Sequence, residues 1–298
     1  MEGFLNINKP QGLTSFDVIR RVTRLFPRKT KIGHLGTLDP MASGVLPVAV
    51  GSATKVIPFI DNESKEYIAD ITFGGVSDTQ DAWGNITYTG RSKDFDTDKL
   101  QEILNSFRGV ISQVPPMYSA VHHQGKRLYD LARQGITVER ASREIEIKDI
   151  DVIDINLSGD LPCIKMKITC SKGTYIRTLC HDIGQTLGMG AFLSGLVRIR
   201  SGMFDIENSY TIEHLLSLNN IAIGQVLLPI DYPIMNMPVI NLNAGEKSIL
   251  NGNKITIDKK YNPGENIRAY ASNGQLIAIA QAVQENNQIE LRPVRVFK

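Results

Sequence analysis

The sequence has few of the features that build membrane proteins, metal sites or disulfide-linked proteins. Its 298 residues contain no run of eighteen apolar residues, and the start, Met1–Phe4, has no charged region before an apolar one. We therefore expect neither a transmembrane span nor a signal peptide. The three cysteines, Cys163, Cys170 and Cys180, lack Cys-x-x-Cys spacing. Their number and spacing argue against a disulfide framework and a structural zinc site, and they favour a reducing, cytoplasmic location.

Histidine and net charge are also scarce. The five histidines are scattered apart from His122 and His123, whose side chains would point to opposite sides of a strand, so we expect no metal site. The formal net charge is only +2, so a nucleic-acid site has to be a local patch. One basic run without acids lies between Val18 and Leu38, although a solvated helix face would explain it equally well. The run consists of Arg20, Arg21, Arg24, Arg28, Lys29 and Lys31.

The apolar pattern predicts an α+β fold. Thr14 and Asp17 form a capping-box signature before a helix. The expected apolar stripe of that helix consists of Phe16, Ile19, Val22 and Phe26, together with Val18 and Leu25. Helical spacing recurs over 98–107 and 176–187, and an apolar run with strand character covers 45–50. Alternation predicts strands over 67–73, 144–148 continuing through 152–155 after a register shift, and 164–170. Helices and strands that do not alternate regularly favour a mixed or largely antiparallel sheet.

Two further segments suggest how the chain is organised. Residues 114–143 are rich in Gly, Pro, Arg and Tyr, which is typical of a functional insert, although an ordinary surface loop with a short helix stays possible. Three prolines between 229 and 238 indicate a connection, so we expect domains over 1–235 and 236–298. Short strand-like runs at 254–257, 267–270, 276–280 and 288–292 predict a small β barrel or sandwich after the connection.

Several glycines and a proline, which give the backbone unusual conformations, surround the carboxylate of Asp39. Glycines at 33, 36 and 44 permit positive φ, and Pro40 pushes Asp39 toward an extended conformation. Asp-Pro alone is common turn chemistry. The apolar run at 45–50 that follows indicates that the loop is anchored on a buried strand. Such a strand would hold Asp39 in a defined position, whereas an ordinary turn would only leave it in solvent.

This segment, GHLGTLDPMASGVLP over 33–47, resembles the motif of the TruB-type tRNA pseudouridine-55 synthases, and Asp39 matches their single catalytic aspartate. Four further blocks agree in the same order, at 8–15, 65–67, 171–177 and 195–198. The resemblance covers nearly all of the first 235 residues, and the last sixty or so are similar to a small RNA-binding PUA domain. It implies the pseudouridine synthase fold, a long curved sheet with the cleft across its face, and a mobile thumb at 114–143.

The resemblance also implies two roles beside the aspartate. Arg177 matches the arginine that pairs with the carboxylate, and its planar fork suits a bidentate contact that keeps the acid charged despite desolvation. Tyr67 matches the tyrosine that packs against the target base. A phenol with a pKa of about 10 is a reluctant base at neutral pH, so stacking is the safer role. Without the motif, a surface ion pair and a core aromatic would explain these residues.

Three more residues have roles only through the family motif. Leu196 corresponds to the apolar residue on the other wall of the uracil pocket. His34 matches the residue that occupies the place of the vacated base, and Lys9 matches one that helps to hold the aspartate loop. Family members often have Lys where this chain has His122, whose neutral imidazole attracts a phosphate less strongly than an ammonium does.

The implied activity is isomerisation of uridine to pseudouridine in the T loop of tRNA, at position 55, after the base has been flipped out. Detaching and rejoining uracil needs no redox step, so we expect no cofactor. Stand-alone action on tRNA, without a membrane or an obligatory protein partner, fits the modest length and the absence of lysine-rich tails. The alternative is a non-catalytic RNA-binding or tRNA-folding protein. A glycoside hydrolase is disfavoured because no second carboxylate motif is present.

Overall fold

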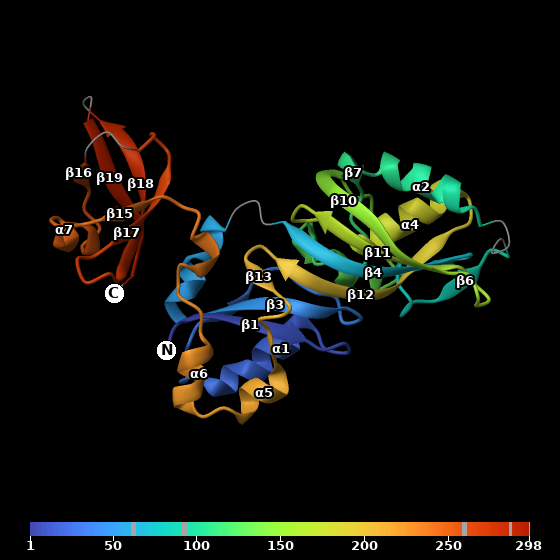
Figure 1. Ribbon diagram of the computed structural model, residues 1–298, viewed down its shortest axis with the longest axis horizontal. Coiled ribbons are helices and arrows are strands. Elements are labelled where there is room, and N and C mark those ends of the chain that lie inside the picture. Colours follow the sequence, from blue (N-terminus) through green and yellow to red (C-terminus); the bar gives the residue numbers. More distant parts are fainter. Residues whose placement is uncertain (61–63, 91–94, 258–260, 286–287, 298) are drawn as a thin grey trace.

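The structure is a computed structural model that describes residues 1–60, 64–90, 95–257, 261–285 and 288–297 (Figure 1). Most of the chain folds around a ten-stranded sheet. The strands of this sheet are β1 (Gly3–Lys9), β2 (Ile32–His34), β3 (Ser43–Val50), β4 (Lys65–Phe73), β7 (Gly109–Gln113), β10 (Arg143–Asn156), β11 (Cys163–Cys170), β12 (Ala191–Ser201), β13 (Phe204–Asp205) and β14 (Tyr210–Thr211).

The sheet is mixed, as the sequence predicts. Its strand order is β14-β1-β3-β12-β4-β11-β10-β7, with β2 beside β3 and β13 beside β12. Strand β12 runs parallel to β3, and β14 runs parallel to β1, whereas the remaining neighbours are antiparallel. The predicted alternation in β4 is confirmed, since Tyr67, Ala69, Ile71 and Phe73 are buried. The register shift predicted near 148 is present between Ile147 and Asp149.

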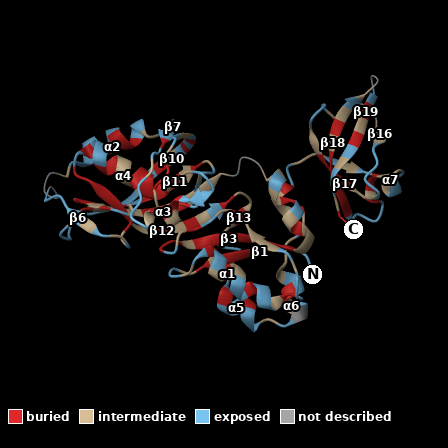
Figure 2. Ribbon diagram, turned by 180° about the vertical axis from the view of Figure 1, so that it is seen from behind, coloured by how far each residue is buried: buried red, intermediate tan, exposed pale blue. Residues whose placement is uncertain are grey.

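Two groups of helices pack on this sheet, one near each end (Figure 1). Both groups contribute to one continuous apolar core cluster (Figure 2). Their bounds are α1 (Ser15–Val22), α5 (Ile212–Ser217) and α6 (Asn220–Val226) at one end, and α2 (Thr97–Ser106) and α4 (Ile176–Leu187) at the other. Helix α4 coincides with its predicted range and ends at Gly188, which adopts the left-handed conformation.

The predicted apolar stripe of α1 is wrong at its first residue. The capping box is present, because the Thr14 side chain accepts from the Asp17 N–H and the Asp17 carboxylate accepts from the Thr14 N–H. The inward face, however, begins at Ser15 and continues through Val18 and Val22. Phe16 is therefore one position out of phase with that face, and 69% of it is exposed.

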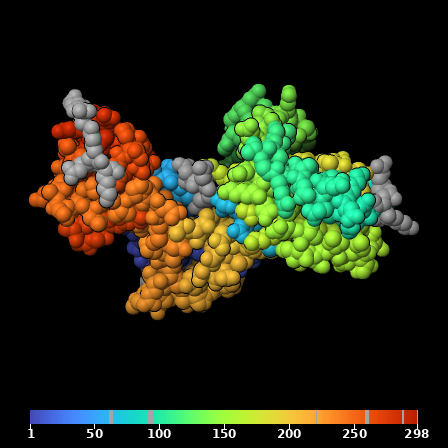
Figure 3. Space-filling view, turned by 45° about the horizontal axis from the view of Figure 1, so that its top comes forward, coloured from blue at the N-terminus to red at the C-terminus, as the bar shows by residue number. Residues whose placement is uncertain are grey.

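Residues 114–143 form a hairpin and a short helix. Strands β8 (His122–His123) and β9 (Lys126–Arg127) are joined through Gln124 and Gly125, both at positive φ, and helix α3 (Leu128–Ala132) follows. Figure 3 shows this part of the chain, in green, projecting from the body of the molecule. A second small hairpin consists of β5 (Gly75–Ser77) and β6 (Ile86–Tyr88).

The C-terminal residues build a separate five-stranded sheet with its own apolar cluster. Its order is β15-β17-β18-β19-β16. A further apolar cluster, including Phe4, Ile234 and Phe297, joins this sheet to the larger one. In the described ranges, no helix is long and apolar enough to span a membrane. The bounds are β15 (Val239–Asn241), α7 (Glu246–Leu250), β16 (Ile255–Ile257), β17 (Asn266–Tyr270), β18 (Leu276–Glu285) and β19 (Gln288–Val296).

Candidate active site

The loop that carries Asp39 is held on both sides, by the first residue of α1 and by the segment before that helix. The Ser15 hydroxyl accepts from the Leu38 N–H at 2.9 Å and donates to the Leu38 carbonyl at 3.1 Å. The Gly12 N–H donates to the Pro40 carbonyl at 2.8 Å. Because backbone groups on either side of residue 39 are fixed, the direction of its side chain is fixed as well.

The loop leads into β3, which approaches β12 very closely. At Gly44, φ is +101°, and a Cβ there would lie 2.2 Å from the carbonyl oxygen of Arg198. A side chain at this position would therefore push β3 and β12 apart. The glycine in the predicted motif is needed for this close backbone contact.

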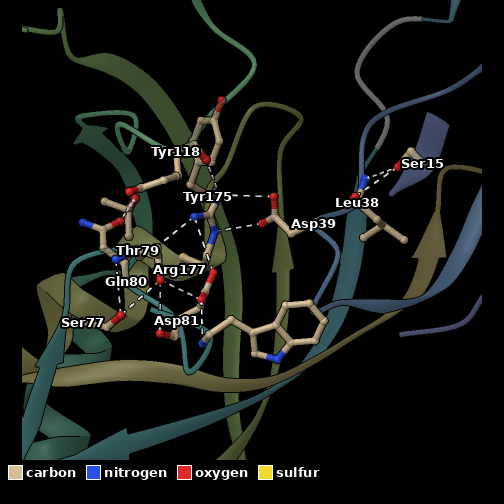
Figure 4. A network of polar contacts seen from close by, with 12 residues as sticks. Ser15, Leu38, Asp39, Ser77, Thr79, Gln80, Asp81, Tyr118, Tyr175 and Arg177 are labelled. Atoms are coloured by element: carbon tan, nitrogen blue, oxygen red, sulfur yellow. Dashed lines mark hydrogen bonds and ion pairs between the residues drawn. The ribbon is translucent and has the colours of Figure 1, made fainter. Parts of the chain in front are cut away.

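Asp39 and Arg177 form a bidentate ion pair, as the resemblance predicts (Figure 4). Arg177 Nε donates to Asp39 Oδ2 at 2.8 Å, and Arg177 Nη2 donates to Asp39 Oδ1 at 3.2 Å. The exposed fraction is 4% for the arginine side chain and 34% for the aspartate side chain. The guanidinium is thus a buried support, while the carboxylate keeps an accessible side.

The remaining donors of Arg177 are used by two other segments. Nη1 donates to the Thr79 carbonyl at 2.9 Å and lies 3.6 Å from Asp81 Oδ2. Nη2 also donates to the Tyr118 carbonyl at 2.8 Å. Segments that are far apart in the sequence therefore meet at one guanidinium, which cannot move without breaking contacts to all of them (Figure 4).

A cavity of about 230 Å³ lies beside the ion pair. It brings together four of the predicted site residues: Asp39, Tyr67, Arg177 and Leu196. These residues come from the aspartate loop, β4, α4 and β12, respectively. The other lining residues are Thr37, Leu38, Lys65, Ser119, Ala120, Gly173, Thr174, Tyr175 and Ile176.

Behind Tyr67 lies an arginine that the sequence analysis did not single out. Arg198 is fully buried; its Nε donates to the Val45 carbonyl at 2.7 Å and its Nη2 to the Gly36 carbonyl at 3.1 Å. It thus links β12 to the backbone on either side of the aspartate loop. Burial raises the pKa of the Tyr67 hydroxyl, and the charge of Arg198 opposes that shift. Arg198 ends the 195–198 block of the resemblance, which is the signal that could have found it.

Lys9 and His34 lie outside the residues that line the cavity. Lys9 is buried at the end of β1, and its Nζ donates to the carbonyls of Pro10 at 3.0 Å and Leu13 at 2.7 Å. Burial lowers the pKa of Lys9 from 10.5 to about 8, although the nearby Asp39 charge opposes the shift. The imidazole of His34, on β2, is partly buried, and burial together with the charges of Arg198 and Lys65 lowers its pKa.

The projecting insert begins at the cavity wall. Ser119 and Ala120 line the cavity, and the Tyr118 carbonyl holds Arg177. The guanidinium groups of Arg127 and Arg133 lie over the ring of Tyr129, at 5.8 and 5.5 Å from its centre. Basic and aromatic side chains are therefore next to one another on a segment connected to the site.

Within the described ranges, no three His, Cys, Asp or Glu side chains gather closely enough to hold a metal ion.

Comparison with known families identifies this arrangement. A model of the TruB family pseudouridylate synthase N-terminal domain matches residues 23–176, and one of the tRNA pseudouridylate synthase B C-terminal domain matches residues 177–235. The chain belongs to the TruB family. The enzyme class that the sequence predicts, a pseudouridine synthase, is confirmed.

Relatives in this family match over the full length. A protein of Syntrophomonas wolfei subsp. wolfei named tRNA pseudouridine synthase B is 53% identical over 299 residues, which cover 100% of this chain and 99% of the relative. A protein of the same name from Clostridium kluyveri is 42% identical over 307 residues, with full coverage of both chains. The TruB-type resemblance is therefore confirmed along the whole chain.

Solved structures agree with the family assignment at the level of fold. One described as an H/ACA RNP bound to a substrate RNA containing 2′-deoxyuridine has a TM-score of 0.72 at 23% identity, covering 99% of this chain and 85% of that one. An archaeal box H/ACA sRNP Nop10-Cbf5 complex gives 0.70 at 24% identity, covering 99% and 86%. The predicted α+β pseudouridine synthase fold with a β-rich C-terminal part is confirmed. The domain limits, the PUA likeness and the residue roles stay predictions.

Proposed function

We propose that this chain converts uridine to pseudouridine in the T loop of tRNA, at position 55, with Asp39 as the catalytic carboxylate. The observation that carries the proposal is the Asp39–Arg177 pair, which opens onto a cavity walled by Tyr67 and Leu196. The relatives named tRNA pseudouridine synthase B support tRNA as the substrate. The order of the predicted motif blocks supports the T-loop position.

The reaction breaks the bond between uracil N1 and ribose C1′, forms a bond between C5 and C1′, and moves the proton from C5 to N1. An ionised Asp39 can attack the sugar or the ring, or it can stabilise positive charge at the anomeric carbon and promote loss of a neighbouring proton. Each route needs a charged carboxylate where the base excludes water. The bidentate contact with Arg177 favours that charged form.

The cavity walls suit a flat base that has left its stack. Tyr67 offers a ring and Leu196 an apolar face to the cavity of about 230 Å³. Because burial raises the pKa of the Tyr67 hydroxyl above its usual 10, even less phenolate is present to act as a base at neutral pH than in a free tyrosine. Tyr67 therefore acts mainly by stacking on the uracil, and each base–aromatic stack offsets about 1 to 3 kcal/mol of the cost of flipping.

The other predicted residues act around this pocket. His34, outside the cavity lining, fills the space that the flipped base leaves in the RNA. Lys9 acts indirectly, because its ammonium organises the carbonyls of Pro10 and Leu13 in the segment that holds the Asp39 loop. The insert over 114–143, which begins at the cavity wall, closes over the RNA as a thumb.

The purified chain can be tested with an unmodified tRNA transcript and no other protein. We expect one pseudouridine per transcript, at position 55, detected by mass spectrometry of nuclease fragments. A matched transcript with cytidine at position 55 should give no product. Absence of product from the first transcript, or product at another position, would contradict the proposal. A requirement for added proteins would contradict stand-alone action.

A further inference from the structure

Helix α1 begins at a residue that contacts the loop of the candidate active site. Phe16, with 69% of its surface exposed, follows Ser15, whose hydroxyl holds both backbone groups of Leu38. Leu38 lines the cavity and precedes Asp39. Phe16 thus directly follows the residue that holds the aspartate loop in place.

The outward direction of Phe16 is fixed by its neighbours. Ser15 points inward to Leu38, and the reciprocal contacts between Thr14 and Asp17 set where the helix begins. These two constraints determine the phase of α1, which leaves residue 16 facing solvent. The chain therefore presents a large, rigid aromatic ring where it could have placed a polar residue.

Positive charge follows Phe16 along the chain. Arg20 lies one turn after Phe16 on α1, about 6 Å away, and Arg24 lies in the 3-10 turn Thr23–Leu25 that comes directly after the helix. Both arginines are exposed. Arg20 contacts Asp17 at 2.8 Å, yet 68% of its side chain stays exposed. The same stretch of sequence contains four more exposed basic residues, Arg21, Arg28, Lys29 and Lys31. A partner with regularly spaced negative charge and flat apolar groups matches such a surface.

We propose that Phe16, Arg20 and Arg24 form a track for the RNA strand that flanks the target uridine. Phe16 stacks on a base next to the one that is flipped out, and the two guanidinium groups contact phosphates of the same strand. This inference rests on the proposed function, because the strand is defined by the uridine that enters the cavity. A protein partner is disfavoured because the charged residues of 16–31 are basic apart from Asp17, which Arg20 contacts, instead of forming a mixed polar rim.

Phe16→Ala tests the stacking contact. We expect the enzyme concentration that gives half-maximal single-turnover rate to rise roughly tenfold, whereas the rate constant at saturating enzyme changes less than about threefold, because Phe16 is not among the cavity-lining residues. Phe16→Trp should restore the wild-type concentration, because an indole also stacks. The matched control is Tyr88→Ala, which removes an aromatic of similar exposure, 65%, from β6 and should leave binding unchanged.

The contacts of Arg20 and Arg24 are tested by the salt dependence of RNA affinity. In an Arg20→Gln, Arg24→Gln double variant, the slope of log affinity against log salt should become shallower by about 1.4, as for two lost phosphate contacts to a single strand. The control is Lys99→Gln with Lys148→Gln, two exposed lysines on α2 and β10. This pair should keep the wild-type slope.

The outcomes separate the inference from the proposed function. If the wild-type chain forms no pseudouridine at position 55, the proposed function fails, and the track with it. If wild type and Phe16→Ala modify the tRNA with the same half-maximal concentration while both remain folded by thermal melting, the proposed function stands and the track is refuted. A change in sedimentation of Phe16→Ala without a change in RNA affinity would also refute it, since that result marks a protein interface.

Discussion

Two aspartate–arginine pairs in this molecule share the same chemistry and differ in what lies beside the acid. At the candidate site, Arg177 is 4% exposed and Asp39 is 34% exposed, next to a cavity. At the junction between the two sheets, Arg268 is 9% exposed and Asp231 is 13% exposed, with their Nη1 and Oδ2 atoms 2.8 Å apart. The arginine is buried in both pairs, so the difference lies in the access to the acid.

Several other protein groups contact the junction pair. The Tyr270 hydroxyl donates to the same Asp231 oxygen that Arg268 contacts. Arg268 also donates to the carbonyls of Met235, at 2.7 Å, and Met237, at 3.2 Å. Burial and the adjacent acid raise the pKa of Tyr270 to about 12. This group of contacts fastens the connecting segment to β17, and it leaves Asp231 less accessible than Asp39.

The comparison shows that an ion pair alone does not identify a reactive carboxylate. Asp39 is supported by a fixed guanidinium and still faces a space that can admit a base, whereas Asp231 is supported by a guanidinium and a phenol that close it off. Changes at Asp39 should therefore appear in activity, and changes at Asp231 should appear in stability.

Asp39→Asn should have the largest effect. We expect the single-turnover rate of pseudouridine formation to fall at least about 10³-fold, because the amide can neither attack nor stabilise positive charge as a carboxylate does. RNA affinity and melting temperature should stay close to wild type. A rate equal to that of the wild-type chain would remove the distinction between the two pairs.

Arg177→Met should affect both activity and stability. Removing the guanidinium leaves Asp39 and Asp81 without their shared cation and the Thr79 and Tyr118 carbonyls without a donor. We expect a loss of about 2 to 4 kcal/mol in the free energy of unfolding and a rate reduced by roughly 10²-fold or more. Arg177→Lys, which keeps the charge but loses the fork, should fall between this variant and wild type. Urea unfolding and single-turnover assays measure the two effects.

Asp231→Asn should lower stability and spare the chemical step. It leaves Arg268 buried with a neutral partner, so we expect the free energy of unfolding to fall by about 2 to 3 kcal/mol. At saturating enzyme and a temperature at which the variant is folded, the rate constant should stay within about threefold of wild type. A rate loss as large as that of Asp39→Asn would show that the junction pair also takes part in catalysis.

Lys9 should have the smallest effect of these residues, and its effect on the free energy of unfolding should depend on pH. Among the described residues, no acid contacts the Lys9 ammonium directly. Its folded pKa of about 8 lies below 10.5, so between these pH values the unfolded chain binds more protons at Lys9 than the folded chain. Lys9 therefore makes the free energy of unfolding rise with pH in this window, while below pH 8 the cost of burying the cation is fully present. Subtracting the urea-unfolding curve of Lys9→Met from that of wild type should reveal this rise; a flat difference would contradict it.

Local elements could largely be predicted from the sequence, because periodicity reports which side of an element is buried. Helix α4 and the alternating strand β4 follow their patterns closely. Phe16 could not be placed by periodicity, because the phase of α1 is set by a hydroxyl contact from Ser15 to a residue twenty-three positions away. One apolar residue within the stripe was therefore assigned to the wrong side.

The sequence could predict the residues that line the site but not the contacts that hold those residues in place. The family resemblance named Asp39, Tyr67, Arg177 and Leu196, which the structure gathers around one cavity. Contacts of Arg177 with the Thr79 and Tyr118 carbonyls depend on the tertiary fold, and carbonyls leave no signature in residue types. The burial of Arg198 behind the aspartate loop was hidden for the same reason, since a charged residue in a strand ordinarily indicates a side chain that faces solvent.

The most direct measurement is a crystal structure of the Asp39→Asn variant bound to a T stem-loop RNA. We expect the target uracil between Tyr67 and Leu196, with its ribose C1′ about 3 to 4 Å from the side chain of residue 39, as a reacting geometry requires. A target base still stacked in the RNA loop, or bound away from residue 39 and Arg177, would contradict the role assigned to the open pair.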